Sequence, residues 1–212
     1  MRPLTEKFKG LIFVISGPSG SGKTTLRDKL FEDKGLKSEL VKSVSLTTRK
    51  KRSGEKSGRD YVFITRDEFN SRLKANKILE WTRYLGYYYA TARGFVEKQL
   101  KHGKNIILCL DLKGALTIKK LYQQNSVSIF ILPPSLEALR RRIKGRCSRT
   151  RKKEIGERLK LARKELLASH RYDYSLANKN LTQATKELKA IILKELSKGK
   201  EIPCPAECGP RD

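Results

Sequence analysis

The sequence predicts an α/β protein with a parallel sheet covered by helices on both faces. Short apolar runs of strand length alternate with stretches of helical periodicity, and a glycine-rich loop joins the first apolar run to the first helix. Parallel strands need such helical crossovers, which bury both faces of the sheet. With 212 residues, 38% of them hydrophobic, the chain can form one domain with an inserted lobe or two small domains, and global disorder is excluded.

The predicted elements follow one another in βα order. A strand at Leu11–Ile15 leads into the glycine loop and then into a helix that runs to about Lys34. The Pro133-Pro134-Ser135 sequence ends a later strand, because proline cannot continue a ladder, and its serine caps the next helix. The remaining strands are expected at 106–110, 127–132 and Tyr174–Ala177, and the remaining helices at Leu112–Tyr122, Ser135–Lys144 and Leu181–Leu196.

Two segments depart from this pattern. Between about Val41 and Gly94 the residues alternate, hydroxyl and tyrosine side chains are frequent, and glycines mark the turns, which predicts an inserted lobe of mixed β structure. From Ser197 to Asp212 there are two glycines, three prolines and no periodicity that could bury a face. We therefore expect a disordered tail at 198–212.

The chain carries 48 Lys and Arg against 22 Asp and Glu, a formal charge of +26. This excess indicates a polyanionic partner, namely nucleic acid, an acidic membrane surface or phosphorylated small molecules. Residues 140–164 hold 13 basic and 2 acidic residues, and residues 49–59 hold 6 and 1. The concentration suggests two phosphate-handling patches; a solvated face is the alternative, and non-specific polyanion binding is compatible with either.

The expected location of the protein is the cytoplasm. No apolar run approaches the roughly 20 residues that span a bilayer, so we expect no membrane segment. The N-terminal residues do not have the apolar region of a secretory signal. Four cysteines in a chain of this length fit no disulfide framework, so free thiols are expected. No feature of the sequence indicates an oligomeric state.

The glycine loop matches the phosphate-binding pattern G-x-x-x-x-G-K-[ST], and it follows a strand and opens a helix, as that pattern requires. Its backbone N–H groups would point at phosphate oxygens, Lys23 would neutralise the β- and γ-phosphates, and the Thr24 hydroxyl would ligate Mg²⁺. This loop, hereafter the P-loop, predicts nucleotide binding by Gly17, Pro18, Ser19, Gly20, Ser21, Gly22, Lys23, Thr24 and Thr25.

Further motifs occur in a fixed order along roughly residues 8 to 197. They are Ser43-Val-Ser-Leu-Thr-Thr-Arg49-x-x-Arg52-x-Gly-Glu-x-x-Gly-x-Asp-Tyr61, Leu79-Glu80-Trp81, Gly86-x-Tyr-Tyr89, Leu110-Asp111-x-x-Gly-Ala115, Ile131-Leu-Pro-Pro-Ser135 and Gly145-Arg146. Together with the P-loop, they resemble the guanylate kinase family. The resemblance implies transfer of the γ-phosphoryl group of ATP to GMP or dGMP, giving ADP and GDP or dGDP, in purine nucleotide metabolism.

The resemblance also implies a single domain over 1–212. A P-loop kinase core would comprise 8–40 and 95–197, a GMP-binding lobe 41–94, and a mobile helical lid about 146–158. The cofactor would be Mg²⁺, and the partners ATP and GMP or dGMP.

The inserted lobe has residues suited to one phosphate. Arg49 and Arg52 lie three apart, where two guanidinium groups could clamp a phosphate, and Tyr61 and Tyr89 could each donate a hydrogen bond. The resemblance implies that these four bind the phosphate of GMP. The alternatives are a solvated turn for the arginines and packing of a small β lobe for the tyrosines.

Guanine offers N–H donors at N1 and N2 and an acceptor at O6, so its recognition calls for a carboxylate and a hydroxyl. By resemblance, Glu80 would accept from N1 and N2, Ser45 would donate to O6, and Thr91 would also touch the base. The alternative for Glu80 is an exposed position on a strand. Asp111 ends a strand where such sheets place ligand contacts, and it would lie on the Mg²⁺ or guanine side or merely cap a helix. Cys109 and Lys113 replace an acidic residue and a glutamine that are usual in the family, and Cys147 replaces a glycine that usually follows the lid arginine at position 146.

The resemblance assigns catalysis to Lys23, Arg49 and two lid arginines, Arg146 and Arg158, which would stabilise the charge of the transferred group. Asn178 follows the last strand, where the family contacts adenine; an Asx turn would explain it as well. The other basic residues of the lid region are assigned to a solvated face or an adventitious anion-binding surface.

Three other functions are weaker interpretations. Guanylate-kinase-like scaffold domains typically lack a working P-loop, which is intact here. Nucleic-acid binding would follow from the charge and could coexist with kinase activity. A P-loop kinase for another phosphorylated ribose compound is disfavoured by Glu80, Ser45 and the arginine pair.

Overall fold

The computed structural model describes residues 8–145 and 152–200. Its core is a five-stranded, all-parallel sheet in the order β2-β7-β1-β8-β9. The strands are β1 Ile12–Ser16, β2 Leu40–Lys42, β7 Asn105–Cys109, β8 Ser126–Leu132 and β9 Tyr174–Ala177. All five residues of the central strand β1 are buried, so both faces of the sheet must be covered.

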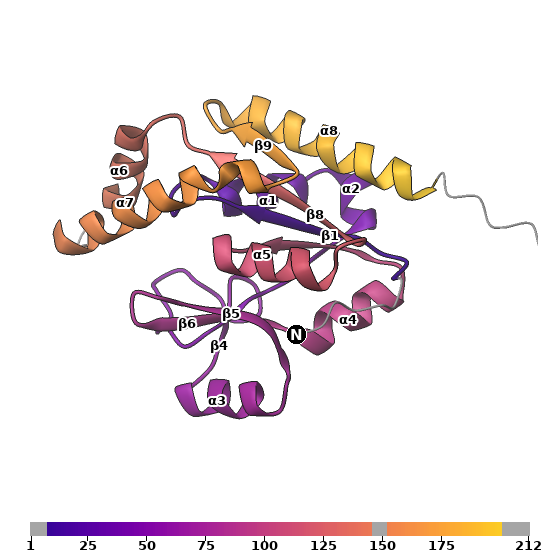
Figure 1. Cartoon of the computed structure of the whole chain (residues 1–212), viewed down its shortest axis with the longest axis horizontal. Helices are drawn as coiled ribbons and strands as arrows, with labels where there is room; N and C mark the ends of the chain where they lie inside the picture. The colour runs from indigo at the N-terminus through magenta and orange to yellow at the C-terminus, as the bar shows by residue number, and fades with distance from the viewer. Residues whose placement is uncertain (1–7, 146–151, 201–212) are drawn as a thin grey trace, which may run out of the picture.

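Alternate residues of the central strands supply two apolar clusters, one on each face of the sheet. Ile12 and Val14 pack toward α4 and α5, whereas Phe13 and Ile15 pack toward α1 and α8. Figure 1 shows these helix pairs on opposite sides of the core sheet. The helices are α1 Lys23–Leu30, α4 Arg93–Lys101, α5 Leu112–Leu121 and α8 Leu181–Lys200, and a short helix, α2 Lys34–Glu39, precedes β2. The predicted α/β class is confirmed.

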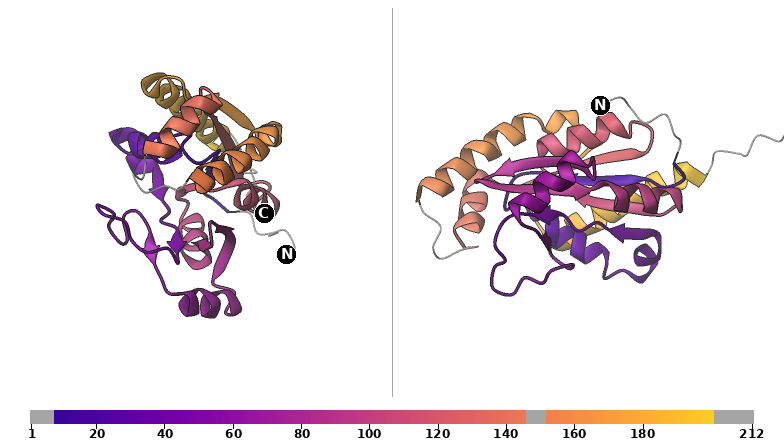
Figure 2. Two further views of the ribbon diagram at one scale, coloured as in Figure 1. Left: turned by 90° about the vertical axis from the view of Figure 1, so that its left-hand side faces the viewer. Right: turned by 90° about the horizontal axis from the view of Figure 1, so that it is seen from below.

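A four-stranded mixed sheet in the order β4-β3-β6-β5 forms a second lobe. One helix, α3, lies at its far end in the left view of Figure 2. Leu46, Phe69, Ile78 and Ala90 form the buried centre of this lobe. The bounds are β3 Leu46–Thr47, β4 Val62–Phe63, α3 Arg66–Lys74, β5 Ile78–Tyr84 and β6 Tyr87–Ala92.

Two helices form the side of the molecule at the left of Figure 1. They are α6 Leu136–Gly145 and α7 Lys152–Leu167, and a 3-10 turn, Ser169–Arg171, leads from α7 toward β9. Leu139 and Ile143 of α6 pack against Ala162 of α7, so the two helices share a small apolar cluster of their own. Within the described residues, no helix is long and apolar enough to cross a bilayer.

Several boundaries differ from the predicted ones. Val41 and Lys42, placed in the inserted lobe by the sequence, pair with Ile106 and Ile107 of the core sheet. Three-residue strands give too little periodicity to be recognised, which is why β2 was not predicted. Helix α3 was also missed, although Thr65 and Glu68 form a capping box at its start.

The last helix is longer than predicted. It continues to Lys200, whereas the sequence placed its end at Leu196 and a disordered tail from 198. The Ser197 hydroxyl donates to the Lys194 carbonyl (2.9 Å), and Lys198 pairs with Glu195 (2.6 Å), so local hydrogen bonds carry the extra turn. The rest of that predicted tail, 201–212, lies outside the described residues.

Candidate active site

The P-loop joins β1 to α1 at the carboxyl edge of the core sheet. Gly17, Gly20 and Gly22 have φ angles of 137°, 92° and 100°, a region that side chains with a Cβ disfavour. A Cβ at Gly17 would lie 2.5 Å from the Ile131 carbonyl oxygen, and one at Gly22 only 2.2 Å from the Asn178 amide nitrogen. Both glycines are therefore needed for backbone shape and for space.

Lys23 begins α1 and its ammonium bends back over the loop. It donates to the carbonyl oxygens of Gly17 and Pro18, the latter at 3.0 Å. Thr24 and Thr25 follow it in the first turn of α1, at the positive end of the helix dipole. A cation, a helix N-terminus and a glycine turn therefore converge at one place, as phosphate binding requires.

Asn178 fixes the P-loop from the end of β9. Asn178 is 5% exposed, and its side-chain amide donates to the Ser21 carbonyl oxygen (2.8 Å). Its backbone N–H donates to the Leu132 carbonyl oxygen (2.8 Å). The side chain at position 178 thus supports the loop itself, a contact that the sequence did not reveal.

Arg49 is the centre of a charged cluster in the second lobe. It is 9% exposed, and its NH1 and NH2 groups donate to the two carboxylate oxygens of Glu55 at 3.0 and 2.8 Å. Its Nε donates to the Tyr89 hydroxyl (3.2 Å), and its Cζ lies 5.3 Å from the centroid of the Tyr61 ring. Three of the four predicted phosphate ligands are therefore together. Arg52 is exposed, and its backbone N–H donates to Glu55 (2.8 Å).

Both members of the Arg49–Glu55 pair remain charged. Burial opposes the positive charge of Arg49, but hydrogen bonds to Glu55 and Tyr89 outweigh it and raise the pKa of Arg49. Burial would raise the pKa of Glu55, but hydrogen bonds from Arg49 and from the Arg52 backbone lower it. No role for Glu55 was predicted from the sequence, where its only signal is its place after Gly54 in the second-lobe motif.

Glu80 is a buried carboxylate on β5, 6% exposed. Thr91, its partner across the β5–β6 ladder, donates a hydrogen bond to its Oε1 (2.6 Å). A Cβ at position 114 would lie 2.6 Å from Glu80 Oε2, so Gly114 makes room for the carboxylate. Burial raises the pKa of Glu80 to about 7, and the Asp111 charge acts in the same direction.

Asp111 and Ser45 are the remaining predicted residues of the base site, and Lys113 and Cys109 are two departures from the usual family residues. Asp111 caps α5 by accepting from the Gly114 N–H (2.9 Å), as the helix-cap alternative had it. Ser45 directly precedes β3. Lys113, a departure from the usual family residue, holds its ammonium 4.6 Å from the Trp81 ring centroid. Cys109 is a free thiol, and burial raises its pKa.

The helix α7 brings two residues toward the P-loop. Arg158 NH1 donates to the Ser19 hydroxyl (3.2 Å), so one predicted lid arginine lies on the loop. Glu165, which no sequence signal singled out, is 6% exposed. Burial raises its pKa to about 7, against the opposing influence of Lys23. The other predicted lid arginine, Arg146, and the departure at Cys147 lie outside the described residues.

The comparison with known proteins decides the family. The sequence model of guanylate kinase matches residues 9–195. The chain belongs to the guanylate kinase family. It is 41% identical over 201 residues to the guanylate kinase of Wolbachia pipientis wMel, an alignment that covers 94% of this chain and 98% of that one. It is 41% identical over 196 residues to the guanylate kinase of Bacillus subtilis strain 168, covering 92% and 94%.

The fold agrees with this membership. A crystal structure of guanylate kinase from Anaplasma phagocytophilum superposes with a TM-score of 0.73 at 34% identity, covering 89% of this chain and 87% of that one. The family's reaction is phosphoryl transfer from ATP to GMP, so the protein is an ATP:GMP phosphotransferase. The resemblance inferred from the motifs is confirmed.

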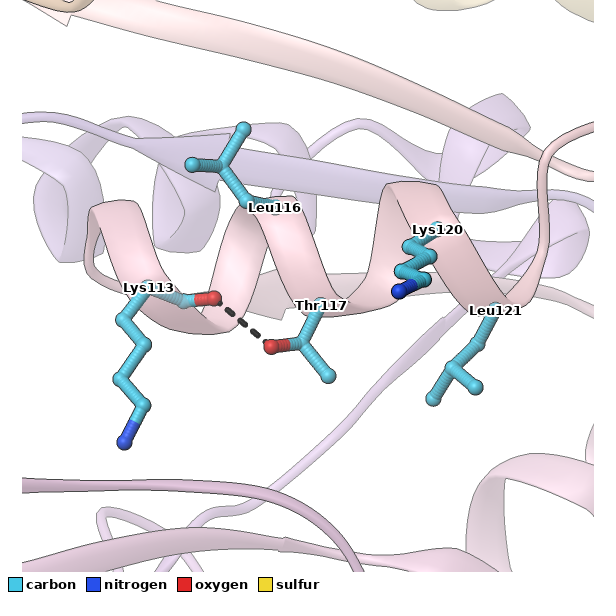
Figure 3. Close-up of a pocket in the computed structure, with 5 residues that line it drawn as sticks. All are labelled: Lys113, Leu116, Thr117, Lys120 and Leu121. Atoms are coloured by element: carbon cyan, nitrogen blue, oxygen red, sulfur yellow. Dashed lines mark hydrogen bonds between the residues drawn. The ribbon is translucent and has the colours of Figure 1, made fainter. Parts of the chain in front are cut away.

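An open hollow on the surface of α5 is lined by none of the site residues predicted above. It has a volume of about 290 Å³ and is formed by one side of α5. Figure 3 shows the side chains of this face, with the Thr117 hydroxyl donating to the Lys113 carbonyl oxygen (2.9 Å). The lining residues are Lys113, Leu116, Thr117, Lys120 and Leu121.

Proposed function

We propose that this guanylate kinase binds ATP on the P-loop, binds GMP or dGMP in the second lobe, and transfers the γ-phosphoryl group directly between them. The observation that supports this most strongly is the buried Glu80–Thr91 pair, because a buried carboxylate beside a hydroxyl is the recognition that guanine needs. No covalent intermediate is required, since positioning and electrostatic stabilisation account for phosphoryl transfer.

The donor site is assigned to the P-loop. The backbone N–H groups of the P-loop, Pro18 excepted, and the Lys23 ammonium would bind the phosphates, and Asn178 would lie on the adenine side while holding Ser21 in place. Within the described residues, no group of three His, Cys, Asp or Glu side chains could hold a metal. Mg²⁺ keeps several of its waters and is bound largely through substrate phosphates. Thr24 would hold it, and the ion would neutralise phosphate charge.

The acceptor site is assigned to the second lobe. Arg49 and Arg52, with the hydroxyls of Tyr61 and Tyr89, would bind the phosphate of GMP. Glu80 would accept from guanine N1 and N2, with Ser45, Thr91 and Asp111 completing the base site. Arg158 and Arg146 would then stabilise the charge on the transferred group, and the Lys23 ammonium would stay bonded to the γ-phosphate during the transfer.

The experiment that tests this function measures ADP formation with Mg²⁺ and ATP, offering GMP, dGMP, AMP, CMP and UMP separately. Turnover with GMP and dGMP alone would support the base assignment. Turnover with AMP at a similar rate would contradict it. Binding of ATP without turnover of any acceptor would favour the scaffold interpretation.

Replacement of Arg49 by lysine is expected to raise KM for GMP about tenfold, because lysine keeps the charge but not the bidentate fork. The measurement is KM for GMP at saturating ATP. Arg59→Lys is the matched control, because Arg59 lies in the same segment but is exposed and pairs with Asp60. Equal KM values for Arg49→Lys and the parent protein would remove Arg49 from the phosphate site.

The affinity for GMP is expected to depend on pH through Glu80. Only the ionised carboxylate can accept from both N1 and N2, and its pKa is raised to about 7. Lowering the pH from 8 to 6 should therefore raise KM for GMP about tenfold. The GMP phosphate titrates near pH 6 as well, so the Glu80→Gln variant, measured over the same range, supplies the correction. Identical profiles for both proteins would disprove the role of Glu80.

The cytoplasm, where ATP and GMP are available, is the proposed location. Non-specific polyanion binding by the charge of +26 is proposed as a secondary property. It should disappear with added salt at concentrations that leave kinase activity intact.

A further inference from the structure

Tyr84 ends β5 at the point where the second lobe meets α7. Its ring faces the guanidinium of Arg158, whose Cζ lies 5.4 Å from the ring centroid. Its hydroxyl oxygen is buried, and its pKa is raised mainly because burial disfavours the phenolate. Tyr84 therefore presents a neutral aromatic face to a cation.

Arg158 is thereby held between two different parts of the molecule. Its NH1 group donates to Ser19 of the P-loop (3.2 Å), while its guanidinium lies over the ring of Tyr84 in the second lobe. A cation over an aromatic face is attracted by the ring quadrupole, and the attraction is larger where water is excluded. The two contacts together restrict the position of a long, flexible side chain.

Tyr84 also contacts the phosphate-binding cluster of the second lobe. Its ring meets that of Tyr89 edge to face, with centroids 6.5 Å apart. The Tyr89 hydroxyl accepts from Arg49 Nε (3.2 Å). A continuous row of contacts therefore leads from Arg49 through Tyr89 and Tyr84 to Arg158 and the P-loop.

We infer that Tyr84 is a positioning residue for phosphoryl transfer, whose ring face places Arg158 against the P-loop. Tyr84 acts through Arg158 and touches neither reacting group. Because the row of contacts joins the second lobe to Arg158, an ordered Arg49–Tyr89 pair favours an ordered Arg158. This inference rests on the catalytic role proposed above for Arg158.

The test is a double-mutant cycle with kcat as the readout. Tyr84→Leu is expected to lower kcat about tenfold, the scale of a cation–π contact in a partly buried site, with KM for ATP unchanged. Tyr84→Phe keeps the ring face and should restore most of the rate. Tyr84→Met also lacks a ring and replaces Tyr84→Leu in the test if Tyr84→Leu folds poorly. The same tenfold loss of kcat is expected for it. The matched control is Tyr87→Leu, an exposed position on the same hairpin that should leave kcat unchanged.

The decisive comparison is made in an Arg158→Ala background. If Tyr84 acts through Arg158, Tyr84→Leu should cost no further activity there. A full additional loss in that background would overturn the inference, because Tyr84 would then act independently. An unchanged kcat for Tyr84→Leu and Tyr84→Met, with Arg158→Ala impaired, would also overturn it. An unchanged kcat for Arg158→Ala would instead refute the proposed role of Arg158, and the inference with it.

Discussion

Replacement of Lys23 by alanine is expected to lower kcat by about three orders of magnitude, on the scale seen when one preorganised electrostatic donor is removed from a transition state. The ammonium lies on the P-loop, bonded to the carbonyl oxygens of Gly17 and Pro18. From this position it can exchange loop carbonyls for phosphate oxygens without moving its backbone. In Lys23→Ala, the developing charge on the transferred group would lose this cation.

The measurement is steady-state kcat at saturating ATP, GMP and Mg²⁺, with thermal unfolding as the test of folding. Lys29→Ala is the matched control, because Lys29 lies on the same helix but is exposed and pairs with Glu32 (2.8 Å). Its kcat should equal that of the parent protein. A Lys23→Ala variant with more than a tenth of the parent kcat would contradict the assignment of Lys23.

The parts of the site that depend on backbone shape could be predicted from the sequence. A phosphate-binding loop needs glycine at fixed spacings, and the positive φ angles of Gly17, Gly20 and Gly22 confirm that need. Glu80 was also found, because its neighbours in the chain form an ordered motif. Both signals lie in short stretches of neighbouring residues, which can be recognised in a sequence without knowledge of the fold.

Contacts between distant segments could not be predicted in the same way. Glu165 has the sequence surroundings of an ordinary exposed helical glutamate, yet the packing of α7 buries it near Lys23. Tyr84 meets Arg158 across 74 positions of the chain, and Asn178 meets Ser21 across 157. Such pairs form only in the tertiary fold, and the residues that flank them in the sequence carry no signal of the contact.

Glu80→Gln is expected to weaken GMP binding and to stabilise the fold at the same time. Glutamine replaces an acceptor for guanine N1 and N2 by a group that has one acceptor and one donor, so KM for GMP should rise about 100-fold, the cost of leaving a buried donor unpaired beside a lost charge. Thr91 can still donate to the amide oxygen, so the ladder contact is retained.

The stability effect follows from the direction of the pKa shift. Below pH 4.5 the carboxyl group is neutral in both folded and unfolded chains, so it carries no penalty. As the pH rises toward 7, the unfolded chain gives up the proton while the folded chain keeps it, and folding becomes less favourable. Above about pH 7 the group is ionised in both the folded and the unfolded chain. The full cost of the buried charge, about 3 kcal/mol, then lowers the free energy of unfolding.

Removing the charge should therefore raise the free energy of unfolding of Glu80→Gln above that of the parent protein at pH 8, and leave the two nearly equal at pH 4.5. Urea unfolding at both pH values measures the difference, with Glu187→Gln on the exposed side of α8 as the control that should change neither. A gain of equal size at both pH values would show that packing, not charge, separates the variants. No gain at pH 8 would mean that the buried charge of Glu80 does not destabilise the folded chain. The prediction that guanine recognition by Glu80 lowers stability would then be wrong.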